Sequence, residues 1–119
     1  MSEVLIQSEL FMNSPKSDAE DVGGGIKRLV MGHDEHLMLV KVWFEKGAVG
    51  EVHAHPHSQA SYVVEGAFEV YVDGKKQVLK AGGSFFVPSG ADHGAVCLEE
   101  GILLDMFSPV RRDFIGLEG

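Results

Sequence analysis

Three of the six histidines of this chain lie within five residues, in the segment HAHPH at positions 53–57. In an extended strand, side chains two residues apart project from the same face, so His53 and His55 can point into one cavity. Two neutral imidazoles on one face are half of a typical transition-metal site. Pro56 interrupts strand pairing, so His57 need not continue in the same direction. Taken alone, the spacing also describes two histidines on a solvated strand, which is the commoner case.

The residues around these histidines have the pattern of many short strands. Fifteen glycines are spread through the chain between short apolar runs, which indicates frequent tight turns. No segment keeps the apolar spacing of an amphipathic helix over three turns. About nine short strands at this spacing predict an all-β sandwich or barrel. The apolar runs that we expect among these strands are 26–31, 37–44, 68–73, 76–80, 84–87, 93–98 and 102–107.

The clearest local signal is a hairpin in the second half of the chain. From position 68 to 72 apolar and polar residues alternate, as in a strand with one buried face. Asp73 and Gly74 form a dipeptide typical of a type I′ turn. Residues 76–80 would then return as the partner strand.

Composition narrows the possible partners. The 119 residues carry a formal net charge of −8, and 45% of them are hydrophobic, which fits one globular domain. The acidic balance, without a run of Lys or Arg, argues against nucleic acid as a partner. No apolar run approaches the ~20 residues of a membrane helix, and the first residues lack a signal-peptide pattern. We therefore expect a cytoplasmic protein with no membrane partner.

The histidine segment and a second segment together resemble the two motifs of the cupin superfamily. The first motif, G-x5-H-x-H-x3,4-E-x6-G, corresponds to residues 47–66, and the second, G-x5-P-x-G-x2-H-x3-N, to residues 82–97. Every Gly, Pro and His of both motifs has a counterpart, and 15 residues separate them. The resemblance implies one cupin domain over residues 1–119, folded as a small β-barrel (double-stranded β-helix, or jelly roll). Its parts would be an N-terminal strand and flexible acidic loop at 1–25, the barrel at 26–108 and a C-terminal tail at 109–119.

The same resemblance implies that His53, His55, Gln59 and His93 bind a divalent transition metal ion. Cupins usually have glutamate where this chain has Gln59, and asparagine where it has Cys97. Four neutral ligands leave the ion its full charge, which favours Lewis acidity over support of a higher-valent state. Alternatively, Gln59 does not coordinate and water completes a three-histidine site. Ni, Zn, Fe, Mn, Cu and Co all suit these ligands.

Cys97 allows two interpretations. Its position four residues after His93 permits a place on the inner face near the metal. A lone cysteine in an apolar strand is more often a small buried hydrophobic residue, and we favour that interpretation. One cysteine cannot form an intramolecular disulfide.

Residues 62–112 are similar to the small pectin-degradation cupins. That family also has glutamine at the motif-1 glutamate position and a D-x-F-x-P-x-R stretch after motif 2, here DMFSPVR at 105–111. Its members convert the unsaturated 4,5-ring monouronate left by polysaccharide lyases into the linear keto form. The resemblance therefore implies a metal-dependent, ring-opening enzyme whose substrate is a small anionic sugar.

For that reaction, the resemblance assigns roles to three residues of the last strand and the tail. Asp105 and Phe107 lie two residues apart on one strand, so both can face the cavity of the histidines. Asp105 is the candidate proton-transfer group, and Phe107 would pack against the sugar face. Arg111 is the candidate clamp for the uronate carboxylate. The plainer alternatives are an outward-facing Asp105, a Phe107 that belongs to the core, and an Arg111 that is a solvated tail charge.

Two other functions suit the same scaffold. A cupin dioxygenase or a different sugar isomerase would also use the metal, although a dioxygenase needs an oxidisable one. A non-catalytic small-ligand-binding cupin would use the cavity alone. In each case we expect a homodimer, because small cupins commonly pair through sheet edges and exchanged N-terminal strands, here residues 1–12.

Overall fold

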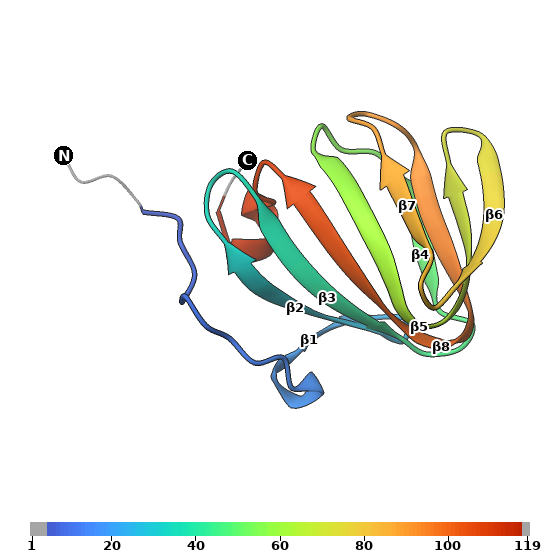
Figure 1. The fold of residues 1–119 in the computed structure, drawn as a ribbon, viewed down its shortest axis with the longest axis horizontal. Helices are drawn as coiled ribbons and strands as arrows, with labels where there is room; N and C mark the ends of the chain where they lie inside the picture. Colours follow the sequence, from blue (N-terminus) through green and yellow to red (C-terminus); the bar gives the residue numbers. More distant parts are fainter. Residues whose placement is uncertain (1–4, 118–119) are drawn as a thin grey trace.

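The computed structural model describes residues 5–117, which contain eight strands and two short 3-10 helices (Figure 1). All strand pairs are antiparallel, in the order β1-β2-β3-β8-β5-β6, with β4 paired to β8 and β7 paired to β5. The predicted all-β barrel is confirmed. The elements are η1 (Lys16–Asp18), β1 (Glu20–Gly23), β2 (Ile26–His33), β3 (Met38–Phe44), β4 (Val49–His53), β5 (Ser58–Val72), β6 (Lys75–Lys80), β7 (Ser84–Val87), β8 (His93–Ser108) and η2 (Arg112–Ile115).

Two of the strands are much longer than the sequence predicted. The runs 93–98 and 102–107 are parts of one strand, β8, with 16 residues, and β5 has 15. The two strands pair with each other along both halves of the barrel (Figure 1). Strand β5 also begins at Ser58, ten residues before the apolar run expected at 68–73. The expectation that all strands are short is therefore wrong.

Glycines at the point where β5 and β8 bend explain this continuity. A Cβ atom on Gly66 would lie 2.5 Å from the carbonyl oxygen of Glu100, and one on Gly101 would overlap the carbonyl oxygen of Glu65. Only residues without a Cβ allow the two backbones to approach so closely. The register between the strands also shifts here, which bends both of them from one half of the barrel into the other.

The predicted hairpin is confirmed between β5 and β6. Asp73 and Gly74 have φ angles of 48° and 82°, as a type I′ turn requires, and Val72 faces Lys75 across it.

The core lies between the two halves of the barrel and is built mainly from inward-facing residues of the neighbouring strands β3, β8 and β5. Phe68 and Phe44 meet edge to face at its centre, with ring centroids 5.1 Å apart. Cys97 is 1% exposed, and its thiol contacts the carbonyl oxygen of Glu99 at 3.0 Å. Burial raises the pKa of this thiol. Cys97 is thus the buried hydrophobic residue that we favoured, and it belongs to the same cluster as Met38, Val40, Val63 and Leu103.

The ends of the chain differ in part from expectation. Residues 14–25 are not simply a loop, because they contain η1 and the strand β1, in which Glu20 pairs with Arg28 of β2. In place of the expected N-terminal strand, the described residues show one isolated bridge between Gln7 and Asp34, and residues 1–4 lie outside the described part. After Pro109 the tail forms the helical turn η2. Over residues 5–117 the structure contains no helix that is long and apolar enough to span a membrane.

Candidate metal centre and adjoining pocket

Three histidines meet at one end of the barrel. His53 ends β4 and pairs directly with His93, the first residue of β8, while His55 follows in the loop after β4. The ring centroid of His93 lies 4.3 Å from that of His53 and 4.7 Å from that of His55. One ligand atom from each ring lies within 4.8 Å of the others. The structure therefore brings together the three histidines that the motifs identified.

The backbone fixes the hydrogen on each imidazole. The Nδ1 atoms of His53, His55 and His93 lie 2.8, 3.0 and 3.0 Å from backbone carbonyl oxygens two residues away. Because a carbonyl oxygen only accepts, each Nδ1 donates, and in the neutral ring the lone pair is on Nε2. This is the arrangement of metal-binding histidines, whose second nitrogen is held by an outer hydrogen bond.

Burial favours the neutral, metal-binding form of His93 in particular. Its Nε2 atom is buried and has no hydrogen-bond partner. Burial lowers the pKa of His93, and positive charge on His53 or His55 would lower this pKa further. The backbone hydrogen bond to Ala91 acts in the opposite direction and raises it. The neutral form, which can bind a metal, is therefore the favoured one.

Gln59 supplies the fourth candidate metal ligand. It lies on β5, it is 6% exposed, and its Oε1 atom is 3.0 Å from Nε2 of His55. Because His55 donates through Nδ1, its Nε2 atom carries a lone pair, and so does the Gln59 oxygen that faces it. A cation bound by both atoms would stabilise this arrangement. Three imidazole nitrogens and an amide oxygen fit a divalent transition metal.

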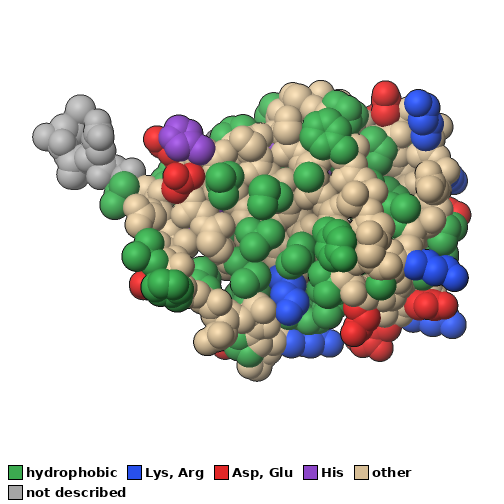
Figure 2. Space-filling model, in the orientation of Figure 1, with side chains coloured by type: hydrophobic (Ala, Val, Ile, Leu, Met, Phe, Trp, Pro, Cys, Tyr) green, Lys and Arg blue, Asp and Glu red, His purple; other side chains and the backbone are tan. Residues whose placement is uncertain are grey.

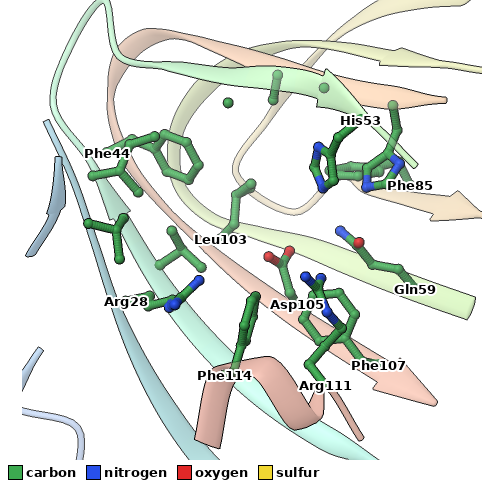
Figure 3. A pocket seen from close by; sticks show the side chains of 17 residues that line it. Arg28, Phe44, His53, Gln59, Phe85, Leu103, Asp105, Phe107, Arg111 and Phe114 are labelled. Carbon is green, nitrogen blue, oxygen red and sulfur yellow. The ribbon is translucent and has the colours of Figure 1, made fainter. Parts of the chain in front are cut away.

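A pocket of about 250 Å³ opens beside these residues (Figure 3). His53 and Gln59 line one end of it, where His93 pairs with His53, and Arg28 and Phe114 lie toward the other. His53 itself is exposed, so the histidines can be reached from solvent. The rest of the lining is mostly apolar and includes Phe44, Val42, Phe85 and Leu103.

Asp105 faces this pocket and not the solvent. It lies on β8 opposite Ser61, whose hydroxyl donates to its Oδ1 at 2.6 Å. Burial raises the pKa of Asp105 to about 6, although the Ser61 hydrogen bond and the positive charge of Arg111 favour its ionised form. A carboxyl group with such a pKa can both accept and release a proton near neutral pH.

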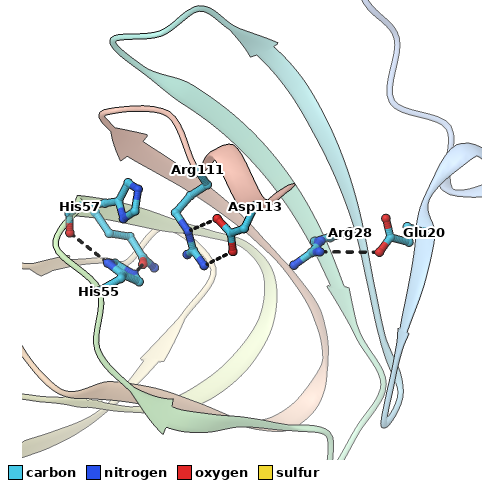
Figure 4. Close-up of polar contacts among 7 residues, drawn as sticks. Glu20, Arg28, His55, His57, Arg111 and Asp113 are labelled. Atoms are coloured by element: carbon cyan, nitrogen blue, oxygen red, sulfur yellow. Dashed lines mark hydrogen bonds and ion pairs between the residues drawn. The ribbon is translucent and has the colours of Figure 1, made fainter. Parts of the chain in front are cut away.

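Arg111 is held at the pocket by its neighbours and is not a solvated tail charge. Its Nε and Nη2 atoms donate to the two carboxylate oxygens of Asp113 at 3.1 and 3.0 Å (Figure 4). The guanidinium carbon lies 4.2 Å from the ring centroid of Phe114 and 5.1 Å from that of Phe107. Asp113 uses one edge of the guanidinium, and no other described residue bonds to the edge formed by Nη1 and Nη2. That edge can bind a second carboxylate with two hydrogen bonds.

Phe107 belongs to both the core and the pocket wall. It is 3% exposed, and its ring centroid lies 5.7 Å from those of His55 and Phe114. The core interpretation of Phe107 is confirmed, and its contact with a sugar stays a prediction.

Sequence analysis missed two polar residues of the site. Arg28 on β2 lies 3.8 Å above the ring centroid of Phe114 and pairs with Glu20 at 3.6 Å (Figure 4). Ser61 connects Gln59 to Asp105. The signal for both was strand periodicity, because each lies two residues from another residue that faces the pocket.

Comparison with known proteins agrees with the motifs. The family model described as "Cupin domain" matches residues 40–107. A pectin degradation protein, KdgF from Dickeya dadantii (strain 3937), is 46% identical over 98 residues, which cover 81% of this chain and 89% of the relative. The crystal structure of an RmlC-like cupin from Shewanella frigidimarina NCIMB 400 is 60% identical with a TM-score of 0.88, over 91% of this chain and 97% of the other.

A second solved structure is similar over most of the barrel. KdgF from a Halomonas species is 46% identical with a TM-score of 0.79, over 82% of this chain and 90% of the other. The family model spans more than half of the chain and includes His53, His55, Gln59 and His93. With its antiparallel barrel and its converging histidines, the chain belongs to the cupin family.

Proposed function

We propose that this protein is a metal-dependent enzyme that converts unsaturated 4,5-ene monouronates into the linear keto form. The observation that carries the proposal is one pocket that holds the histidine centre, the Asp105 carboxyl group and the open guanidinium edge of Arg111. The similarity to KdgF proteins, named for pectin degradation, gives it further support.

His53, His55, Gln59 and His93 would hold the metal. When bound, the ion supplies Lewis acidity that stabilises negative charge on an oxygen of the substrate. The reaction needs no redox partner, because it is an isomerisation in which one proton leaves the substrate and another returns. Neutral ligands suit such a role.

The remaining residues act on the sugar itself. Asp105 takes the proton of the C1 hydroxyl, the bond between C1 and the ring oxygen breaks, and its electron pair passes to that oxygen. The resulting enolate becomes the ketone when a proton is added at C4, and Asp105, once protonated, can supply it. Arg111 binds the uronate carboxylate through its Nη1 and Nη2 edge, while Phe107 packs against the ring.

An ultraviolet assay tests this proposal. A lyase-generated unsaturated monouronate absorbs through its conjugated alkene, and ketonisation removes that absorbance. We expect the protein to accelerate the loss well above the spontaneous rate, and a chelator to abolish the acceleration. If metal-loaded protein gives only the spontaneous rate, the proposal is wrong. Oxygen uptake would then test a dioxygenase on the same scaffold, and ligand binding without turnover would indicate a binding protein.

We also propose that the protein is a homodimer. The outward face of β8, β5 and β7 carries large apolar side chains where an exposed sheet face would normally be polar. Phe86, Tyr62 and Met106 on it are 60%, 47% and 46% exposed. Hydrophobic side chains are spread over this region in Figure 2. The N-terminal arm beside the barrel adds Leu10 and Phe11, which are 80% and 92% exposed.

A second copy is the partner that fits, because it would bring both a matching apolar face and its own arm. Sedimentation equilibrium is expected to give twice the mass of one chain. Substitution M106E places a charge within this face and is expected to shift the equilibrium to monomers. Substitution V78E on β6, where Val78 is 49% exposed, is the matched control and should leave the dimer intact. A monomeric wild type would contradict the proposal.

A further inference from the structure

Ser61 links the histidine centre to Asp105 through a chain of two hydrogen bonds. It lies on β5 two residues after Gln59, on the same face, and directly opposite Asp105 of β8. The Gln59 amide nitrogen donates to Ser61 Oγ at 3.0 Å, and Ser61 Oγ donates to Asp105 Oδ1 at 2.6 Å. Ser61 is 2% exposed, so no bulk water competes for its hydroxyl group.

The direction of this chain follows from the hydrogens that are available. A serine hydroxyl has one hydrogen, and an oxygen–oxygen distance of 2.6 Å is typical of a hydroxyl that donates to a carboxylate. With that hydrogen given to Asp105, the Ser61 oxygen can only accept, and the group that it faces on Gln59 must be the amide nitrogen. Ser61 therefore decides which end of the Gln59 side chain points away from it.

The end that points away is the carbonyl oxygen, and it faces the histidines. Oε1 of Gln59 lies 3.0 Å from Nε2 of His55, which carries a lone pair because His55 donates through Nδ1 to the carbonyl oxygen of His57. Without Ser61, the amide could turn over and donate its N–H to His55 instead. That orientation would occupy the lone pair of His55 and remove an oxygen ligand.

We propose that Ser61 is a positioning residue of the metal centre. Its hydroxyl holds the Gln59 amide with the carbonyl oxygen toward the cation, and with the same hydrogen bond chain it holds the Asp105 carboxylate beside the substrate. The inference rests on the proposed function for the metal centre. It can be tested without a sugar, because its first consequence is on metal affinity.

Cobalt(II) is a suitable probe, since its visible absorption reports the number and geometry of its ligands. In titrations of purified protein with Co²⁺, we expect S61A to bind roughly 10-fold or more weakly than wild type, as is common when an outer partner of a ligand is removed. Its spectrum should approach that of Q59A. Substitution S61T keeps the hydroxyl group and should restore both the affinity and the spectrum.

A double-mutant cycle separates positioning from general damage. If Ser61 acts through Gln59, S61A should weaken Co²⁺ binding little further in a protein that already carries Q59A. Substitution V63A is the matched control, because Val63 lies two residues further along the same face of β5 and is fully buried. It should lower the thermal midpoint and leave Co²⁺ affinity unchanged.

The outcomes distinguish this inference from the proposed function. Unchanged Co²⁺ affinity in S61A, or full additivity with Q59A, overturns the role of Ser61 even if the enzyme opens uronates. Weakened affinity together with a wild type that does not act on uronates supports the positioning role and contradicts the substrate. A wild type that does not bind Co²⁺ overturns both.

Discussion

Replacing His53 and His55 together by alanine is expected to abolish stoichiometric metal binding and all metal-dependent activity. The two residues supply two of the three imidazoles whose lone pairs converge, so His93 and Gln59 alone would remain. Loss of outer partners of metal ligands typically costs roughly 10–100-fold in affinity, and the loss of two ligands should exceed that. Metal content after dialysis, measured by mass spectrometry, and titration calorimetry would show the change.

The barrel itself should survive this substitution. His53 is exposed and lies at a strand end, and neither histidine belongs to the apolar core cluster. The thermal midpoint of the metal-free variant should therefore stay close to that of the metal-free wild type. The added metal should stabilise only the wild type, because a ligand stabilises the folded state that binds it.

A histidine outside the centre provides the control. The side chain of His36 is 77% exposed, in the turn between β2 and β3, and H36A should retain full metal content. Metal bound at full stoichiometry by the H53A/H55A variant would show that the ion is held elsewhere. The proposed function would then lose its metal centre.

The sequence predicted this centre well because its ligands follow two short, regular patterns. The two-residue repeat of a strand places His53 and His55 together, and the motif around Pro88 and Gly90 identifies His93 although it lies 38 residues after His55. The structure adds the reason why these patterns work. His53 is the direct partner of His93 across β4 and β8, so one register sets both.

Other parts of the site depend on long-range packing that no local pattern reveals. Arg28 reaches the pocket because it lies on Phe114, which the turn η2 brings back from the end of the chain. Arg111 bonds to Asp113, which is only two residues away in the sequence. Arg111 also contacts Phe107, and this core residue comes from β8. The length of β5 and β8 was missed because Gly66 and Gly101 read as turn residues, whereas they allow two continuous strands to bend together.

Asp105 should control the pH dependence of both activity and stability. In the metal-free protein burial raises its pKa to about 6, above the 3.8 of an ordinary aspartate. The folded state therefore holds this proton more tightly than the unfolded state. The stabilisation that this gives is fully present below pH 3.8 and is lost as the pH rises through about 6. The size of this effect is on the order of 3 kcal/mol.

Substitution D105N removes the titrating group and keeps an oxygen that can accept from Ser61. The difference in stability between the metal-free variant and metal-free wild type should therefore change in favour of the variant as the pH rises from 4 to 7. Thermal midpoints measured across this range would show the gain. Ring opening should fall by about 10²–10⁴-fold, the usual contribution of a general acid–base group, while metal content stays at the wild-type level.

The wild-type activity should also depend on pH in the direction that a base requires. If ionised Asp105 takes the proton of the C1 hydroxyl, kcat/KM rises with pH through the pKa of this carboxyl group. A bound divalent cation favours the ionised form, so this rise should lie at or below about pH 6 in the metal-loaded enzyme. In D105N the rise should disappear.

A matched change at a distant carboxylate separates these effects from a loss of surface charge. Asp73 is exposed in the turn between β5 and β6, where its φ angle of 48° is one that asparagine also tolerates. Substitution D73N removes the same charge and should change neither the stability difference between pH 4 and pH 7 nor the rate of ring opening. If D105N shows wild-type kinetics, proton transfer belongs to another group, and only the metal centre, Arg111 and Phe107 would remain of the proposed mechanism.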